Sequence, residues 1–352
     1  MAEPQAVISR PAGATVFLVV TVTPGHEDTV RGLLEDVSGL RRSVSFRAPG
    51  DELGCVVGIG SAAWDRLFSG PRPQELHPFV ELTGRRHRAP STPGDLLFHV
   101  RARRTDLCFE LARLIMERLD GAVTVADEVH GFKYFDDRDL LGFVDGSENP
   151  EGPAADDAVF VGDEDPAFAG GSYVIVQKYL HDLRAWNALP SDEQERVIGR
   201  TKLANVELPD DVKPADSHVA LNTVTDDNGD ERKIVRENMP FGTLGEGEFG
   251  TFFIGYARTP EVTERMLRNM FLGAGPAPHD RILDFSTAIT GCLFHVPPAG
   301  FLDDLPAAPG EREAREEPAP DDEPAPDPAA TAGERPTANG SLGIGSLKGV
   351  RT

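Results

Sequence analysis

Two stretches of the chain repeat one pattern, HVRARRTDLCFELARLI at residues 99–115 and IGYARTPEVTERMLRNMF at residues 254–271. Each begins as an apolar, strand-like run, passes through Ala-Arg and a Thr, and continues with the spacing of an amphipathic helix. Ala102 and Ala257 hold the same place in this joint and are 155 residues apart. A joint that returns after such an interval predicts that one supersecondary unit is used twice.

The rest of each half fits this repeat. The strands are expected at 17–22, 96–102, 173–179 and 251–257, and the helices at 28–37, 106–119, 182–189 and 261–270. The first strands of the two halves begin 156 residues apart, at Phe17 and Tyr173. We therefore predict an α+β fold made of two ferredoxin-like modules packed together. Chance similarity between two strand-helix joints is the alternative interpretation.

Changes in composition divide the chain into four expected parts. The first module covers residues 1–150 and the second covers residues 151–302, with a long loop at 149–171 rich in Asp, Gly and Pro. Residues 303–338 are rich in Pro, Ala and acids and lack aromatic side chains, which predicts a disordered linker. Residues 339–352 form a short terminal peptide with apolar side chains.

Charge and cysteine content exclude several classes of protein. The net charge is −23, and residues 303–335 carry eleven acids and three bases, so nucleic acid is not an expected partner. No apolar run is long enough for a membrane span and no signal peptide is evident, so we expect a cytoplasmic protein with no membrane partner. Cys55, Cys108 and Cys292 lack metal-type spacing and are expected to be buried free thiols.

Three stretches contain residues that could do chemistry. His218, in PADSHVALNTV, follows a turn-like segment that can hold one imidazole at the mouth of a cavity. Asp145, in LLGFVDGSENP, lies between Gly142 and Gly146, which let the backbone bend close to a ligand. Arg236 and Asn238, in KIVRENMPFG, are two apart on an extended segment and would point to one side. Taken singly, each could also be an ordinary structural or surface residue.

In combination the three stretches resemble the dye-decolourising peroxidases, in particular their bacterial type B branch. The GxxDG motif at 142–146, a histidine about 70 residues later and the run RENMPF at 236–241 follow in the family's order, and the resemblance covers about residues 10 to 300. It implies that haem b binds in the second module with His218 as the proximal iron ligand. The carboxylate partner of His218 would be Asp280 or Asp284.

The resemblance also implies an activity. Such an enzyme reduces hydrogen peroxide through a high-valent ferryl haem and oxidises organic dye-like or phenolic donors, or Mn(II). Asp145 would move a proton, Arg236 would stabilise negative charge and Asn238 would orient peroxide or water, and either Asp145 or Arg236 could dominate. Non-peroxidase haem binding, a chlorite dismutase-like activity and a non-catalytic cargo role remain as alternatives.

Aromatic and aliphatic residues complete the expected haem pocket. Phe253 and Leu272 are expected to line it, which would keep large substrates out. Electrons would then reach the haem edge directly or through Trp186 or Tyr179, although core packing is the alternative role of both aromatic residues.

The terminal peptide is similar to the cargo-loading peptides of enzymes packaged in encapsulin nanocompartments. In SLGIGSLKG, Leu342, Ile344 and Leu347 are the expected anchors, and a flexible linker would let the enzyme hang away from the docking surface. The resemblance therefore implies an encapsulin shell as partner and a homo-oligomer whose several tails bind together.

Overall fold

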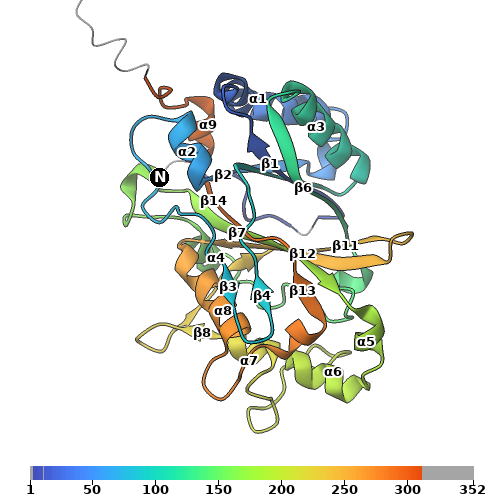
Figure 1. Ribbon diagram of the computed structural model, residues 1–352. Coiled ribbons are helices and arrows are strands. Elements are labelled where there is room, and N and C mark those ends of the chain that lie inside the picture. The colour runs from blue at the N-terminus through green and yellow to red at the C-terminus, as the bar shows by residue number, and fades with distance from the viewer. Residues whose placement is uncertain (1–2, 11, 311–352) are drawn as a thin grey trace, which may run out of the picture. The chain divides into compact units, whose positions relative to one another are not determined.

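Ten strands pair into one antiparallel sheet that runs through both halves of the chain (Figure 1). The structure, a computed structural model, describes residues 3–10 and 12–310. In spatial order the main strands are β10 (Val235–Arg236), β12 (Glu248–Ala257), β7 (Ser172–His181), β14 (Cys292–Val296), β2 (Gly54–Gly60), β5 (Leu96–Ala102), β1 (Ala14–Val22) and β6 (Val123–Phe132). The remaining two, β11 (Met239–Thr243) and β13 (Ser286–Ala288), pair with β12 and β7.

Helices and short hairpins fill the connections between these strands. The α-helices within the described ranges are α1 (Glu27–Ser45), α2 (Ser61–Leu67), α3 (Thr105–Arg118), α4 (Pro153–Val159), α5 (Leu183–Asn187), α6 (Ser191–Ile198), α7 (His218–Asn222), α8 (Pro260–Leu272) and α9 (Ala299–Asp303). The hairpins are β3 (Leu82–Thr83) with β4 (Arg88–Ala89), and β8 (Val224–Thr225) with β9 (Glu231–Arg232). Every predicted strand and helix occurs, and the predicted loop at 149–171 also contains α4 and a 3₁₀ turn, Pro166–Phe168.

Each half of the sheet repeats the strand order of a ferredoxin-like module. Along the chain, the strands of the first half are β1, β2, β5 and β6. Across the sheet they lie in the order β2, β5, β1, β6, so the second strand of the half comes first, followed by the third, the first and the fourth. The strands β7, β10, β12 and β14 of the second half lie in the same order, and β14 pairs with β2 to join the two halves. The predicted α+β fold of two ferredoxin-like modules is therefore confirmed.

The sheet curls so that its two halves face each other. On β1, Val16, Leu18 and Val20 are buried in the cluster that includes α1 and α3. Phe17 points the other way, because successive strand residues alternate, and it stacks on Phe252 of β12 with ring centroids 4.1 Å apart. The first half therefore has one filled core beneath its helices and shares a second core with the other half.

The helix α8 begins and ends at clear signals in the sequence. The Thr259 hydroxyl accepts a hydrogen bond from the Glu261 backbone N–H, and Pro260 occupies the first helical position. Gly273 follows the last residue with a φ of 86°, a conformation that glycine adopts without strain. This helix packs against β7 and β12 and forms one wall of the site described below.

The predicted boundaries of the four parts stay predictions. The described residues, 3–10 and 12–310, belong to one compact unit, since a single sheet passes through both modules. The predicted disordered linker lies outside the described residues from 311 onward, and the peptide 339–352, with Leu342, Ile344 and Leu347, lies wholly outside them. Cys55, Cys108 and Cys292 are free, as predicted, although Cys55 is only half-buried.

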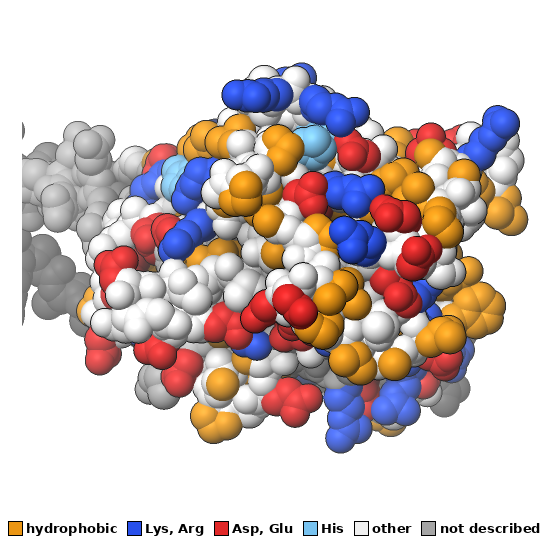
Figure 2. Space-filling model, turned by 90° about the horizontal axis from the view of Figure 1, so that it is seen from below, with side chains coloured by type: hydrophobic (Ala, Val, Ile, Leu, Met, Phe, Trp, Pro, Cys, Tyr) orange, Lys and Arg blue, Asp and Glu red, His pale blue; other side chains and the backbone are white. Residues whose placement is uncertain are grey.

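Acidic and basic side chains are mixed on one face of the molecule (Figure 2). The face in Figure 2 carries Lys and Arg beside Asp and Glu, without a broad field of one sign. Ion pairs between separate elements, such as Arg281 with Glu193 at 3.6 Å, follow from this mixture. None of the described helices has the length and apolar content needed to cross a bilayer.

Candidate active site

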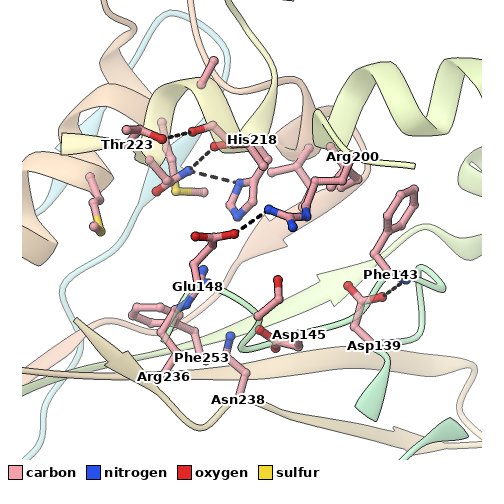
Figure 3. Close-up of a pocket in the computed structure, with 18 of the residues that line it drawn as sticks. Asp139, Phe143, Asp145, Glu148, Arg200, His218, Thr223, Arg236, Asn238 and Phe253 are labelled. Atoms are coloured by element: carbon pink, nitrogen blue, oxygen red, sulfur yellow. Dashed lines mark hydrogen bonds and ion pairs between the residues drawn. The ribbon is translucent and has the colours of Figure 1, made fainter. Parts of the chain in front are cut away.

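A cavity of about 680 Å³ opens in the second half of the molecule (Figure 3). Its walls come from the loop at 139–148, from β7 and β12, and from α7 and α8. A volume in this range is typical of sites that enclose a cofactor or other sizeable ligand. Its lining includes His218, Asp145, Arg236, Asn238 and Phe253.

One wall presents the imidazole of His218. This residue is the first of α7, and the preceding Ser217 caps the helix by accepting a hydrogen bond from the Ala220 backbone N–H. The Nδ1 atom of His218 lies 2.7 Å from Oδ2 of Asp280, whose side chain is fully buried. The ring points into the cavity, and Nε2 makes no hydrogen bond within the described part of the chain (Figure 3).

The structure distinguishes the two carboxylates proposed as partners of His218. Asp280 contacts His218 through Oδ2 and, through Oδ1, accepts a hydrogen bond from the Ile282 backbone N–H at the start of the 3₁₀ helix η4 (Arg281–Asp284). Asp284 instead contacts His87 and His279. Asp280 therefore acts both as a helix cap and as the hydrogen-bond partner of the imidazole, and these roles do not compete because each uses its own oxygen.

The opposite wall carries Asp145, Arg236 and Asn238 (Figure 3). Asp145 lies in a tight loop in which Gly142 and Gly146 both have positive φ, at 92° and 74°. Its Oδ1 accepts a hydrogen bond of 2.7 Å from the Gly146 backbone N–H. The two glycines thus let the chain turn sharply and hold the carboxylate at the cavity wall.

An asparagine that the sequence analysis did not select holds the strand of Arg236. The side-chain amide of Asn149 donates to the Arg236 carbonyl at 2.7 Å and accepts from the Arg236 backbone N–H at 3.0 Å. Asn238 is fixed separately, because its Oδ1 accepts a hydrogen bond from the Ile254 backbone N–H. Asn149 lies four residues after Asp145, so the loop that presents the carboxylate also fixes the backbone that presents the guanidinium.

Glu237, the residue between Arg236 and Asn238, points away from the cavity. Glu237 forms a buried ion pair with Arg101 of β5, as the alternation along an extended segment requires. The Arg101 guanidinium also donates to the Ala6 carbonyl. Because β5 belongs to the first half, this pair ties the strand of Arg236 and Asn238 to the other module.

Three further ionisable groups of the cavity wall, Asp139, Glu148 and Arg200, were also missed from the sequence. Burial raises the pKa of Asp139 to about 7, although the backbone N–H of Phe143 donates to its Oδ1. Glu148 and Arg200 form an ion pair of 2.6 Å on the cavity wall. Asp139 was hard to find because its environment depends on segments distant in the chain.

The prediction that Leu272 lines the pocket is wrong, whereas Phe253 does lie on the cavity wall. Leu272 is 48% exposed and ends α8. The residues of α8 on the cavity wall are Thr263, Met266, Leu267 and Met270. Their spacing of three and four defines one face of a helix, and Leu272, two positions beyond Met270, falls on the opposite face.

Both aromatic residues considered as electron relays have structural contacts. Trp186 is fully buried, donates from Nε1 to the Leu141 carbonyl at 2.9 Å and packs edge-on against Phe143. Tyr179 lines the cavity, and its hydroxyl donates a hydrogen bond to Oε1 of Gln177. Burial raises the pKa of this hydroxyl. These contacts account for both side chains as core residues, and a relay function stays a prediction.

Comparison with known proteins assigns the chain to a family. The model of the N-terminal part of Dyp-type peroxidases matches residues 4–133, and that of the C-terminal part matches residues 136–301. A dye-decolorizing peroxidase from Mycolicibacterium paratuberculosis is 60% identical over 348 residues, which cover 99% of this chain and 93% of the relative.

Solved structures agree with this assignment. The encapsulated DyP-type peroxidase from Mycobacterium smegmatis is 61% identical with a TM-score of 0.87, over 88% of this chain and all of that chain. A variant of DypB from Rhodococcus jostii in complex with heme is 58% identical with a TM-score of 0.83, over 86% of this chain and 98% of that chain. The chain is therefore a member of the Dyp-type peroxidase family.

Proposed function

We propose that the cavity of this peroxidase binds haem b with His218 as the iron ligand, and that Asp145, Arg236 and Asn238 act on hydrogen peroxide from the other side. One observation carries the proposal. An imidazole with a free Nε2 and a buried carboxylate behind its Nδ1 faces a carboxylate, a guanidinium and an amide across one cavity. A haem-bound DypB of the same fold supports the choice of cofactor.

The residues of the cavity fit a haem. The volume of about 680 Å³ is large enough for a sizeable cofactor, and Phe253, Met266, Leu267 and Met270 provide apolar surface for a macrocycle. Arg200, Lys213 and Lys233, also on the cavity wall, could hold anionic groups at its rim. A carboxylate-paired histidine is the common arrangement for a metal ligand.

The pair of His218 and Asp280 sets the character of the iron ligand. A hydrogen bond from Nδ1–H to a buried carboxylate fixes the tautomer, so that the lone pair is on Nε2, and it makes the imidazole a stronger electron donor. Bound haem iron supplies the redox chemistry that reduces the peroxide. The protein contributes the orientation of the ring, through the cap at Ser217 and the bond to Asp280.

Asp145, Arg236 and Asn238, on the wall opposite His218, have separate roles. Cleavage of peroxide requires one oxygen to lose a proton and the other to gain one, and the Asp145 carboxylate is placed to hold that proton in transit. The Arg236 guanidinium supplies a fixed positive charge where negative charge develops on the departing oxygen. With its Oδ1 engaged by the backbone of Ile254, Asn238 has its amide NH₂ available to orient peroxide or water.

Organic dye-like or phenolic donors are the reductants that the family relationship supports best. Several acids of the cavity wall have basic partners, as in Glu148 with Arg200 and Glu207 with Lys213, so a Mn²⁺ ion bound by these acids would have to compete with existing ion pairs. Oxidation of Mn(II) therefore stays a prediction. The alternatives of a chlorite dismutase-like, carrier or non-catalytic protein are not favoured, because relatives about 60% identical over nearly the full length are dye-decolorizing peroxidases.

Absorption spectroscopy of His218→Ala tests the assigned ligand. We expect the purified wild-type protein to show a Soret band that changes on addition of one equivalent of hydrogen peroxide, and the variant to lose haem or show a shifted, weakened band. The matched control is His181→Gln, which changes another cavity histidine that bonds to the Ser286 and Thr251 hydroxyls and should retain haem. Normal haem content and an unchanged band in His218→Ala would rule out the assignment.

The terminal peptide supports a second part of the proposal, a cargo role. A relative 61% identical is an encapsulated DyP-type peroxidase, and the sequence of residues 339–352 has the apolar anchors Leu342, Ile344 and Leu347. We propose that this peptide binds the inner face of an encapsulin shell and that several copies on a homo-oligomer act together.

Co-expression with a shell protein tests the cargo role. Truncation after residue 338 should abolish co-purification with the shell, while haem content and peroxide reaction stay unchanged. A triple change of Leu342, Ile344 and Leu347 to Ala should have the same effect without shortening the chain. Packaging of both variants at the wild-type level would refute the proposal.

A further inference from the structure

Two histidines and an aspartate converge at a place outside the cavity. His87 belongs to the turn between β3 and β4, His279 to the segment after α8, and Asp284 ends η4. One potential ligand atom from each lies within 4.8 Å of the other two. None of the three lines the cavity, so the haem site leaves this cluster unexplained.

Both imidazoles aim at the same carboxylate oxygen. The Nε2 atom of His87 lies 3.2 Å from Oδ1 of Asp284, and the Nε2 atom of His279 lies 3.1 Å from it. The ring centroids are 4.7 Å apart with planes inclined at 57°, so the rings are not stacked flat on each other. The two ring nitrogens thus converge on one carboxylate oxygen.

The contacts of the Asp284 carboxylate are concentrated on one of its two oxygens. Arg86 also approaches Oδ1 of Asp284, at 3.4 Å, so three donors crowd one oxygen. The other oxygen, Oδ2, accepts no hydrogen bond within the described part of the chain. Since a carboxylate has acceptor positions on both oxygens, donors that only needed partners would be expected to spread over both.

The backbone around the cluster is firmly held. The Gly84 backbone N–H donates to the His87 carbonyl and closes the turn, and a side chain at Gly84 would meet the Phe271 carbonyl oxygen at 2.0 Å. The Asp280 backbone N–H donates to the Met270 carbonyl and fixes the segment behind His279. The ligand atoms are therefore brought together by the fold and not by a flexible loop.

We propose that His87, His279 and Asp284 form a binding site for a divalent transition-metal ion of the Zn²⁺ type. Imidazole nitrogen and carboxylate oxygen bind Zn²⁺ at about 2.0–2.2 Å, so two ligands of one ion lie roughly 3 to 3.5 Å apart, as the two histidine–aspartate contacts do.

The cluster is open enough for an ion to enter and to keep water ligands. The side chain of His279 is 10% exposed, whereas those of His87 and Asp284 are 18% and 27% exposed. Arg86, at 65% side-chain exposure, can turn into solvent when a cation takes its place beside Asp284. Three protein ligands with the fourth position left to water are the arrangement of open zinc sites.

This site is independent of peroxide chemistry, although it lies close in sequence to the residues behind the haem. His279 directly precedes Asp280, and Asp284 closes the 3₁₀ turn that Asp280 caps. Metal binding should therefore stiffen the turn that holds the partner of His218, without contributing a group to the cavity.

Isothermal titration calorimetry of the untagged holoenzyme with Zn²⁺ tests the proposal. We expect one Zn²⁺ per chain with a Kd in the micromolar range or below, and at least tenfold weaker binding in His87→Ala and in Asp284→Asn. The control is His130→Ala, which removes one member of an exposed histidine–carboxylate pair, His130 with Glu128, that lacks a third ligand. This control should bind Zn²⁺ as wild type does.

The haem spectrum provides the check on folding. Because His87 is partly exposed and belongs to a surface turn, His87→Ala should keep its Soret band and haem content while it loses the metal. Mg²⁺, which prefers oxygen ligands, should not compete. Absence of saturable Zn²⁺ binding, or binding of wild-type strength in both His87→Ala and Asp284→Asn, would overturn the proposal, whatever the outcome of the haem experiments.

Discussion

The two modules share one fold, but the first encloses a packed core where the second encloses the cavity. Ala102 and Ala257 align β5 and α3 with β12 and α8 at an interval of 155 residues. At this interval the cavity residues Thr251, Phe253, Thr263, Met266 and Met270 correspond to Leu96, Phe98, Cys108, Leu111 and Ile115, all fully buried. The site thus occupies positions that are core in the other module.

Helix length explains why only one module is hollow. In the first module the 19-residue α1 packs beside α3 and closes the layer over the sheet. In the second module the chain between β7 and β10 forms only short helices, α5, α6 and α7, of five, eight and five residues. Because these helices are short, they leave space over β7 and β12. The site of the second module therefore lies where its helical layer is incomplete.

The largest expected effect comes from truncating the two equivalent phenylalanines. Phe98→Ala should lower the free energy of unfolding by about 3 to 5 kcal/mol, because the ring is fully buried and leaves a cavity. Phe253→Ala should cost only about 1 kcal/mol, because that ring already borders open space. Urea denaturation of both variants measures the difference, and equal losses would show that the second module is packed as tightly as the first.

Sequence similarity identified the duplication but did not give the correct residue correspondence for every strand of the two modules. The joint that contains Ala102 and Ala257 aligns correctly, whereas the interval of 156 between Phe17 and Tyr173 is wrong by three. Val20 pairs with Leu96 of β5, and Tyr179 pairs with Thr251 of β12. Since Leu96 and Thr251 are equivalent, Val20 corresponds to Tyr179, at an interval of 159 residues. An odd shift exchanges the two faces of a strand, so the pattern of apolar residues in β1 and β7 could not reveal which side faces the cavity.

The residues of the site were predictable to different degrees. His218, Asp145, Arg236 and Asn238 were found because their motifs occur in a recognisable order along the chain. Leu272 was misplaced because its phase on α8 depends on where the helix faces the sheet.

Two supporting residues were not predicted, for a related reason. Asn149 holds the backbone of Arg236 across 87 residues of sequence, and nothing in its local sequence distinguishes it from an asparagine in a turn. Asp139 is perturbed by burial that only the folded cavity creates. Positions defined by a motif can be read from sequence, whereas those defined by tertiary contact cannot.

Residues of the first module introduced into the second should make the cavity wall more apolar and change its shape. Thr251→Leu and His181→Val import the counterparts of those positions, Leu96 and Val22. Ser286→Ala in the same protein removes the remaining hydroxyl that bonds to His181, so no buried polar partner is left behind. The altered, more apolar wall should weaken haem binding at least tenfold and raise the stability of the apoprotein by about 1 to 2 kcal/mol.

Haem titration of the apoprotein and urea denaturation measure these two effects. The reverse exchange, Leu96→Thr, should destabilise the first module and leave haem affinity unchanged, since Leu96 lies in the core and not on the cavity wall. Wild-type haem affinity in the triple variant would mean that these three side chains do not limit the space available to the cofactor.

The smallest effect concerns Asp139, a carboxyl on the cavity wall whose pKa is raised to about 7 by burial. Between about pH 4, where an unfolded aspartate titrates, and pH 7, the native state holds the extra proton, so this group lowers stability as pH rises. Asp139→Asn removes that loss and should gain about 1 to 2 kcal/mol relative to wild type between pH 5 and 8, with solvent in the cavity reducing the full linkage value. In the first module, Arg104 lowers the pKa of Asp106, so Asp106→Asn should give a constant difference over this range, and parallel pH profiles for the two variants would show that the cavity does not perturb Asp139.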